Sequence, residues 1–134
     1  MPSFTSPFRW RIIAQMSNAY EIHDVDLLDK ASTDPDRGSE APWRMTLRYP
    51  NVWTPEVKQA ATTRVGQKFL AFSRFPAARS AVDSHGVTTV RWTDMRFVGG
   101  VVALDQPAPR TGLFTATVRL APDGRVLEQY VGAR

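Results

Sequence analysis

The sequence of 134 residues contains no cysteine, only three lysines and no long apolar run. The lack of cysteine excludes a disulfide framework, a thiolate metal site and a cysteine nucleophile. No apolar run approaches the roughly 20 residues that a membrane-spanning helix needs, and residues 1–10 carry no hydrophobic signal-peptide segment. We therefore expect one soluble domain over residues 1–134, with a core large enough to fold without covalent or metal cross-links.

Positive charge comes almost entirely from arginine. The chain has 17 basic and 13 acidic residues, which gives a net charge of +4. Arginine-rich basic chains invite comparison with nucleic-acid-binding proteins. Here the arginines are scattered, and several alternate with apolar residues, as Arg9 and Arg11 do, which is typical of the solvated face of a sheet. Without a cluster of four basic residues, we expect no specific nucleic-acid partner.

Hydrophobic alternation dominates the N-terminal part. Residues 8–28 alternate with a period of two and predict a β-hairpin, with a bulge near His23 that restores the facing of the second strand. Residues 29–53 are predicted to form a long loop. Within that loop, Trp43 to Tyr49 alternate between two prolines, which indicates a short strand at the edge of a sheet.

The middle of the chain carries the helix signal. Thr54 suits an N-cap, and apolar residues spaced by four and three from Val57 to Phe72 predict one helix over residues 54–75. Antiparallel strands are predicted over residues 79–131. Strands, one helix and more strands indicate an α+β fold, in which a curved antiparallel sheet is covered by the one long helix. Cystatin-like and nuclear-transport-factor-like rolls share this general architecture.

Catalytic motifs are missing from the sequence. His23 and His85 are the two histidines, and neither has a second ligand at metal-binding spacing on a helix. No nucleophile-elbow serine and no phosphate-binding glycine pattern occurs. We therefore expect no catalytic residue, no metal and no cofactor in this chain alone.

The four tryptophans divide into two pairs. Trp10 and Trp92 occupy inward positions of predicted strands, so we expect both in the core. Trp43 and Trp53 flank a proline-containing stretch, where exposed aromatic rings suit a ligand mouth, a membrane surface or a protein interface. We take Trp43 and Trp53 as candidate interface aromatics.

Several motifs, in a fixed order, carry a resemblance to a known family. They are Ser-Pro-Phe-Arg-Trp-Arg at residues 6–11, the stretches 20–28, 69–76 and 90–97, and the ending 114–126. Together they resemble the soluble C-terminal region of the bacterial inner-membrane metal-dependent hydrolase family, over residues 6–131. Ser6 stands where that family usually has asparagine. The family's metal-binding histidines lie in a preceding membrane part, so the resemblance carries no metal ligand onto this chain.

The resemblance implies a non-catalytic accessory or interaction domain in a bacterium, associated with the membrane on a side that the sequence leaves open. Its partner would be a membrane hydrolase module or another protein. The alternative is a stand-alone small-ligand-binding protein or enzyme with a pocket between helix and sheet. A lined pocket would favour the alternative, and a filled core with an exposed aromatic patch would favour the interaction domain.

Three of the residues that match the family form a candidate ligand site. Arg74 ends the predicted helix, where a cation complements the helix dipole. Asp94 lies at an inferred bulge of the strand below it, so we expect Arg74 and Asp94 to pair. Arg96 is expected to reach Asp94 poorly, because both lie on one strand. In a sharper hypothesis, Arg74 and Arg96 flank a small anionic ligand.

Overall fold

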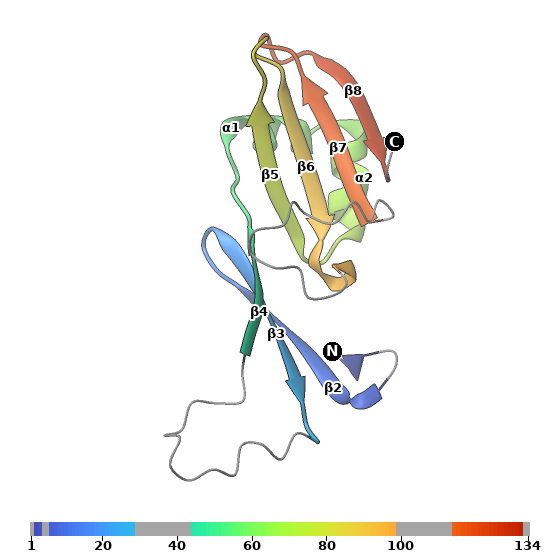
Figure 1. Cartoon of the computed structure of the whole chain (residues 1–134). Coiled ribbons are helices and arrows are strands. Elements are labelled where there is room, and N and C mark those ends of the chain that lie inside the picture. The colour runs from blue at the N-terminus through green and yellow to red at the C-terminus, as the bar shows by residue number, and fades with distance from the viewer. Residues whose placement is uncertain (1, 4–5, 29–43, 99–113, 133–134) are drawn as a thin grey trace.

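The computed structural model describes residues 2–3, 6–28, 44–98 and 114–132 (Figure 1). In this part of the chain, eight strands form two antiparallel sheets, ordered β1-β2-β3-β4 and β5-β6-β7-β8. The strands are β1 (Pro2–Ser3), β2 (Ser6–Gln15), β3 (Ala19–Asp26), β4 (Arg44–Pro50), β5 (Pro76–Val82), β6 (Thr88–Asp94), β7 (Thr115–Leu120) and β8 (Val126–Val131). The helices are α1 (Pro55–Ala61), α2 (Arg64–Phe72) and the short 3-10 helix η2 (Met95–Phe97).

The single helix predicted over residues 54–75 is instead two short helices. Thr54 caps α1 as predicted, since its side-chain oxygen accepts a hydrogen bond from the Val57 amide at 3.3 Å. Thr63 then caps α2 in the same way, by accepting from the Gly66 amide at 3.2 Å. The Thr62 and Thr63 hydroxyls each donate to a carbonyl of the preceding turn at 2.7 Å, which offers the backbone an alternative to continuing the helix.

The fold class expected from the sequence is therefore wrong in its architecture. No long helix covers a single curved sheet in the described residues, and the comparison with cystatin-like and nuclear-transport-factor-like rolls fails with it. The coarser features are confirmed: helices and strands are mixed, and both sheets are antiparallel. No helix within the described ranges has the length and apolarity to cross a membrane.

The strand predictions agree better with the structure. Strands β2 and β3 form the hairpin expected over residues 8–28, and the register of β3 against β4 shifts between Ile22 and His23, where a bulge was expected. Strand β4 lies at the edge of its sheet, as predicted from its flanking prolines. The second expected bulge, at Asp94, is instead the end of β6, where η2 begins.

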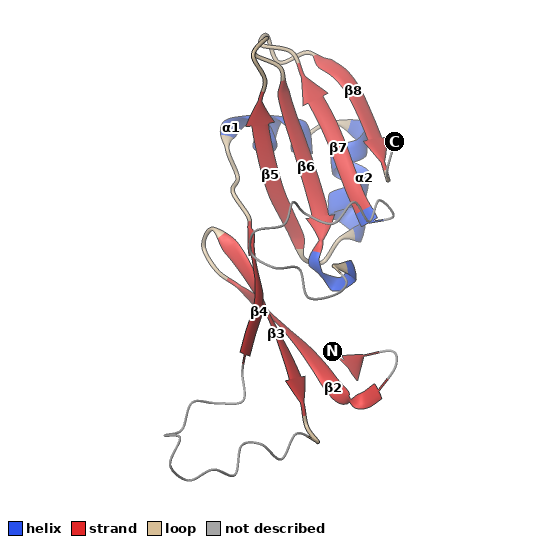
Figure 2. Ribbon diagram, viewed as in Figure 1, coloured by secondary structure: helices blue, strands red, loops and turns tan. Residues whose placement is uncertain are grey.

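The main core lies between the two helices and one face of the β5–β8 sheet (Figure 2). Val57 and Ala60 of α1 and Phe69 of α2 pack there, all buried. The sheet contributes its side of the same cluster, namely Ala78, Val90, Trp92, Ala116, Val118 and Leu120. The predicted inward position of Trp92 is confirmed.

A second cluster joins the two sheets. Four residues of the β1–β4 sheet are buried there against the end of the other sheet. They are Tyr20, Ile22, Leu47 and Tyr49, and they pack on Ala77 of β5, Met95 of η2 and Val98. The Tyr20 and Phe75 rings meet edge to face, with centroids 6.4 Å apart. Figure 1 shows the β1–β4 sheet extending away from this contact, beyond one end of the β5–β8 sheet.

Candidate functional site

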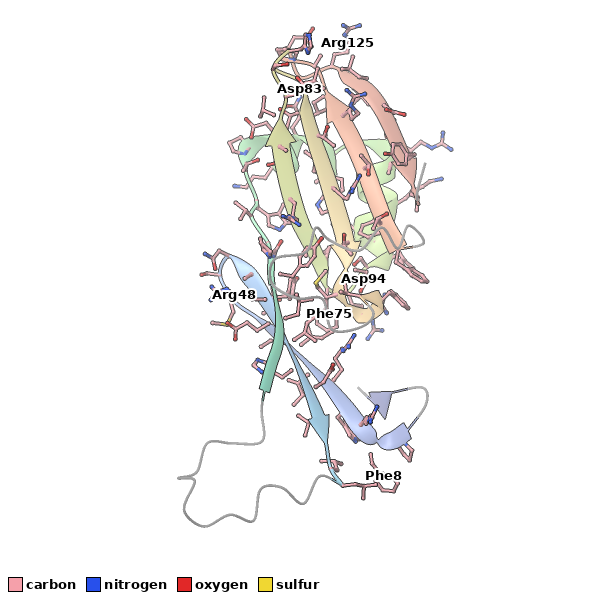
Figure 3. All side chains as sticks on the ribbon, viewed as in Figure 1. Phe8, Arg48, Phe75, Asp83, Asp94 and Arg125 are labelled. Atoms are coloured by element: carbon pink, nitrogen blue, oxygen red, sulfur yellow. The ribbon has the colours of Figure 1, made fainter. Side chains whose placement is uncertain are left out.

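Asp94 anchors a polar junction at the end of β6. Its side chain is fully buried, and its Oδ2 accepts hydrogen bonds from the Ser73 hydroxyl at 2.8 Å and from Arg96 Nη2 at 2.7 Å. Its Oδ1 accepts from Arg96 Nε at 3.1 Å and from the Arg96 amide at 3.0 Å, which caps η2. Figure 3 places Asp94 at the junction between the two sheets, near Phe75. The carboxylate is therefore fully engaged by neighbouring groups.

These hydrogen bonds fix the charge state of the junction. Burial alone would raise the pKa of Asp94, but hydrogen bonds from the Arg96 side chain and amide and from Ser73 outweigh it and lower that pKa below its usual value. The same pairing raises the pKa of the Arg96 guanidinium. The pair is therefore ionised at neutral pH and binds as a salt bridge.

Aromatic rings surround the guanidinium of Arg96. Its central carbon lies 5.0 Å from the ring centroid of Phe97 and 5.5 Å from that of Phe72. The Phe114 ring stacks on Phe97 at 3.6 Å and on Phe72 at 6.5 Å. A guanidinium that is paired with a carboxylate and also packed on two rings is poorly placed to bind a further ligand.

The predicted pairing of this site has the wrong partner. Arg96, which we expected to reach Asp94 poorly, is its ion-pair partner, because the chain turns into η2 directly after Asp94. Arg74 is exposed and makes no ion pair with any residue that the structure describes. Its neighbour Ser73, the C-cap of α2, makes the contact that ties the helix end to the sheet. A ligand-binding role for Arg74, Asp94 and Arg96 stays a prediction.

Of the two candidate interface tryptophans, Trp43 and Trp53, the structure describes Trp53. Trp53 is 38% exposed, and its Nε1 donates to Asn51 Oδ1 at 3.0 Å. The same oxygen accepts a hydrogen bond from the buried Ala78 amide at 2.9 Å. Asn51 therefore connects Trp53, in the link from β4 to α1, with strand β5. Trp43 lies outside the described residues.

An exposed apolar surface lies at the far end of the β1–β4 sheet. Phe8 and Trp10 of β2 are 46% and 41% exposed, and Leu27 and Leu28, which follow β3, are each 62% exposed. The Leu27 amide donates to the Phe8 carbonyl at 2.8 Å, which places these two residues opposite each other at the same end of the hairpin. We call these four residues the apolar tip. Figure 3 shows Phe8 at the end of the hairpin that is remote from the β5–β8 sheet.

Strand alternation explains why Phe8 and Trp10 of the apolar tip are exposed. Ile13, Ile22 and Leu47 pair across β2, β3 and β4 and face the cluster that joins the two sheets. Phe8 and Trp10 have the opposite parity, so they lie on the other face. The expectation that Trp10 is a core residue is therefore wrong. The alternation of Phe8 and Trp10 with arginines was visible in the sequence, but it does not show which face is covered.

Metal chemistry finds no support in the described part of the chain, where no three His, Cys, Asp or Glu side chains gather in one place. His23 Nε2 lies 3.6 Å from Glu21 Oε2 on the same strand. The other carboxylate oxygen of Glu21 lies 3.6 Å from Arg48 Nη1 on the neighbouring strand β4. This arrangement offers one carboxylate and one imidazole, fewer ligands than a structural metal site uses.

Comparisons with known proteins add no relative to this picture. No protein-family model, no curated protein and no solved structure matches the chain.

Proposed function

We propose that this chain is a non-catalytic interaction domain that docks onto a partner protein through its apolar tip. The observation that carries the proposal is the gathering of Phe8, Trp10, Leu27 and Leu28 at one exposed end of a sheet. Exposed apolar patches on folded domains mark protein or membrane contacts. Tryptophan and phenylalanine are also the side chains that protein interfaces favour at their centres.

The packing of the core gives no support to the alternative, a ligand pocket between helices and sheet. Val57, Ala60 and Phe69 lie directly against the sheet in one buried cluster, and Trp92 fills its centre with no exposed surface. The fully buried carboxylate of Asp94 is paired with the Arg96 guanidinium. The described residues therefore offer apolar packing where that alternative needs convergent polar groups.

For the partner, we propose a membrane hydrolase module of the family that the sequence resembles. Phe8 and Trp10 belong to the Ser-Pro-Phe-Arg-Trp-Arg motif that begins the resemblance. One of the motifs that carry the resemblance thus also presents two exposed aromatic side chains. In this proposal the chain supplies contact surface, and the module supplies the metal and the chemistry.

Site-specific photo-crosslinking in bacterial cells tests the proposal. A photoactivatable residue in place of Trp10 should crosslink to a membrane hydrolase module, identified by mass spectrometry. Val82 is the matched control position, because it is an apolar strand residue, 65% exposed, in the other sheet. Crosslinks to a different protein would retain the interaction domain but overturn the hydrolase partner. Equal, weak crosslinking from positions 10 and 82 would overturn both.

A further inference from the structure

The face of the β5–β8 sheet that points away from the helices concentrates arginine and hydroxyl side chains, of which Arg79 and Arg91 are exposed and Thr117 is buried. The helices cover the other face, where Val90, Trp92 and Val118 are buried. Because side chains alternate along each strand, residues of the opposite parity lie away from the helices. They form two rows across the four strands, Arg79, Arg91, Thr117 and Tyr130 in one and Ala81, Thr89, Arg119 and Glu128 in the next. We call these eight residues the arginine face.

Charge on the arginine face is unbalanced at one pair of residues. Arg79 and Arg91 lie directly opposite each other on β5 and β6, and both are exposed. Arg119 in the next row pairs with Glu128 at 3.5 Å. Arg79 and Arg91 have no carboxylate partner among the residues that the structure describes. Like charges directly opposite each other destabilise a pair of strands, so this arrangement weakens the sheet while the face is empty.

Each of these two arginines makes one contact with a residue of a neighbouring strand. The guanidinium carbon of Arg79 lies 5.4 Å from the ring centroid of Tyr49, on β4. Arg91 Nε lies 3.4 Å from Thr117 Oγ1, on β7. A guanidinium has five N–H donors, and in the described structure Arg91 uses one and Arg79 uses none. Most donors of both groups therefore have no acceptor among the described residues.

We propose that Arg79 and Arg91 form a binding site for an oxyanion of the phosphate type. A phosphate group presents several acceptor oxygens and two negative charges, so it takes paired N–H donors from two guanidinium groups at once. Its charge also removes the repulsion between the two arginines. A single carboxylate would balance only one of them. The site is separate from the apolar tip and does not depend on the function proposed for it.

Thermal unfolding in the presence of pyrophosphate tests the site. Sodium pyrophosphate should raise the unfolding midpoint of the wild-type chain above that in sodium chloride of equal ionic strength, because a ligand that binds the folded state stabilises it. The double variant Arg79→Ala/Arg91→Ala should lose this rise and bind pyrophosphate about tenfold or more weakly. Nuclear magnetic resonance titration should show amide shifts centred on positions 79 and 91.

The matched control removes the same charge elsewhere. Lys58 and Arg64 are exposed residues of α1 and α2, on the helical side of the domain. Lys58→Ala/Arg64→Ala should keep the full response to pyrophosphate. An equal loss of response in both double variants would show that only net charge matters and would overturn the site. The absence of any specific response in the wild type, to pyrophosphate and to phosphate-bearing vesicles alike, would overturn it as well.

A second arm separates two sources of the phosphate group. Vesicles of phosphatidylcholine with phosphatidic acid are compared in flotation with vesicles of phosphatidylcholine alone. Flotation only with phosphatidic acid, lost in Arg79→Ala/Arg91→Ala, would assign the site to a lipid headgroup. A pyrophosphate response without flotation would assign it to a small phosphorylated ligand in solution. Phe8→Ser/Trp10→Ser, which alters only the apolar tip, should leave the pyrophosphate response unchanged.

Discussion

The two sheets have the same size and the same antiparallel pairing, yet they use their apolar residues in opposite ways. In the β5–β8 sheet, α1 and α2 cover one face, and Val90 and Trp92 have no exposed surface. In the β1–β4 sheet, the buried cluster of described residues lies where the sheet meets its neighbour, and at its far end Phe8 and Trp10 are 46% and 41% exposed. The covering layer, more than the alternation within a strand, decides which aromatic residues become core and which become surface.

The largest expected difference in stability is between alanine variants of two tryptophans that both lie on strands with alternating apolar residues. Trp92→Ala should lower the free energy of unfolding by about 3–5 kcal/mol, because it empties the centre of the helix-covered core. Trp10→Ala should cost less than about 1 kcal/mol, because its ring is already 41% exposed. Urea denaturation monitored by circular dichroism measures both. Equal losses would contradict the contrast between the sheets.

Trp92 also allows a finer test of what its ring contributes. Its Nε1 is buried and has no hydrogen-bond partner within the described structure. Removing a donor loses a hydrogen bond only where one exists, so Trp92→Phe loses ring volume and no hydrogen bond. This variant should therefore be clearly more stable than Trp92→Ala, in the same denaturation experiment. A Phe variant as unstable as the Ala variant would show that the indole nitrogen is bonded.

The next effect concerns the junction that joins the sheets. Asp94→Asn should lower stability by about 1–3 kcal/mol, because Arg96 loses its buried anionic partner. The pKa of Asp94 is lowered in the folded chain, so its contribution is complete above the ordinary carboxyl pKa and is lost as pH falls through the lower folded value. The stability gap between wild type and variant should shrink on acidification accordingly.

Asp123→Asn is the matched control for the loss of a carboxylate charge. Asp123 is an exposed carboxylate in the turn between β7 and β8, and its side chain is 67% exposed beside Arg125. An exposed ion pair contributes little to stability. The control should therefore show only a small loss at neutral pH, as measured by the same denaturation experiment. A constant gap for Asp94→Asn would show that its carboxylate is not ionised in the fold.

Local patterns predicted the strands and the cap at Thr54, because alternation and capping depend on neighbouring residues. The break between α1 and α2 was harder to predict, since the apolar spacing from Val57 to Phe72 continues across it. Threonines at positions 62 and 63 lower the helix propensity of the segment but do not by themselves predict a break. In the structure Thr63 starts a second helix, and this changes which apolar residues face the sheet.

The candidate sites show the same limit of sequence reasoning. Asp94 was correctly expected to need a cationic partner, but the choice between Arg74 and Arg96 depended on where β6 ends. A bulge would have turned Asp94 toward the helix, whereas the start of η2 brings Arg96 back over it. The cross-strand pairing of Arg79 with Arg91 depends on the register between strands, which no local pattern supplied.

A smaller effect follows from the broken helix. Phe72 ends α2 and is 55% exposed, whereas the earlier residue Phe69 is 4% exposed. Phe72→Ala should cost about 0.5–1.5 kcal/mol, the value of its contacts with the Phe114 ring and Arg96. Phe69→Ala should cost about 3–5 kcal/mol and serves as the buried reference in the same urea titration. A Phe72 loss that matches the Phe69 loss would mean that α1 and α2 present one continuous apolar stripe.

The smallest expected effect is a gain in stability, and it separates a binding surface from a structural one. Arg91→Thr should raise the free energy of unfolding by about 0.2–1 kcal/mol in buffer without multivalent anions, because it removes the repulsion from Arg79 directly opposite. The gain should shrink in high salt, which screens the exposed charges. Arg119→Thr is the control and should give no gain, because it breaks the ion pair with Glu128. If Arg91→Thr instead destabilised the chain, Arg91 would serve the fold through Thr117, and its presence opposite Arg79 would need no ligand to explain it.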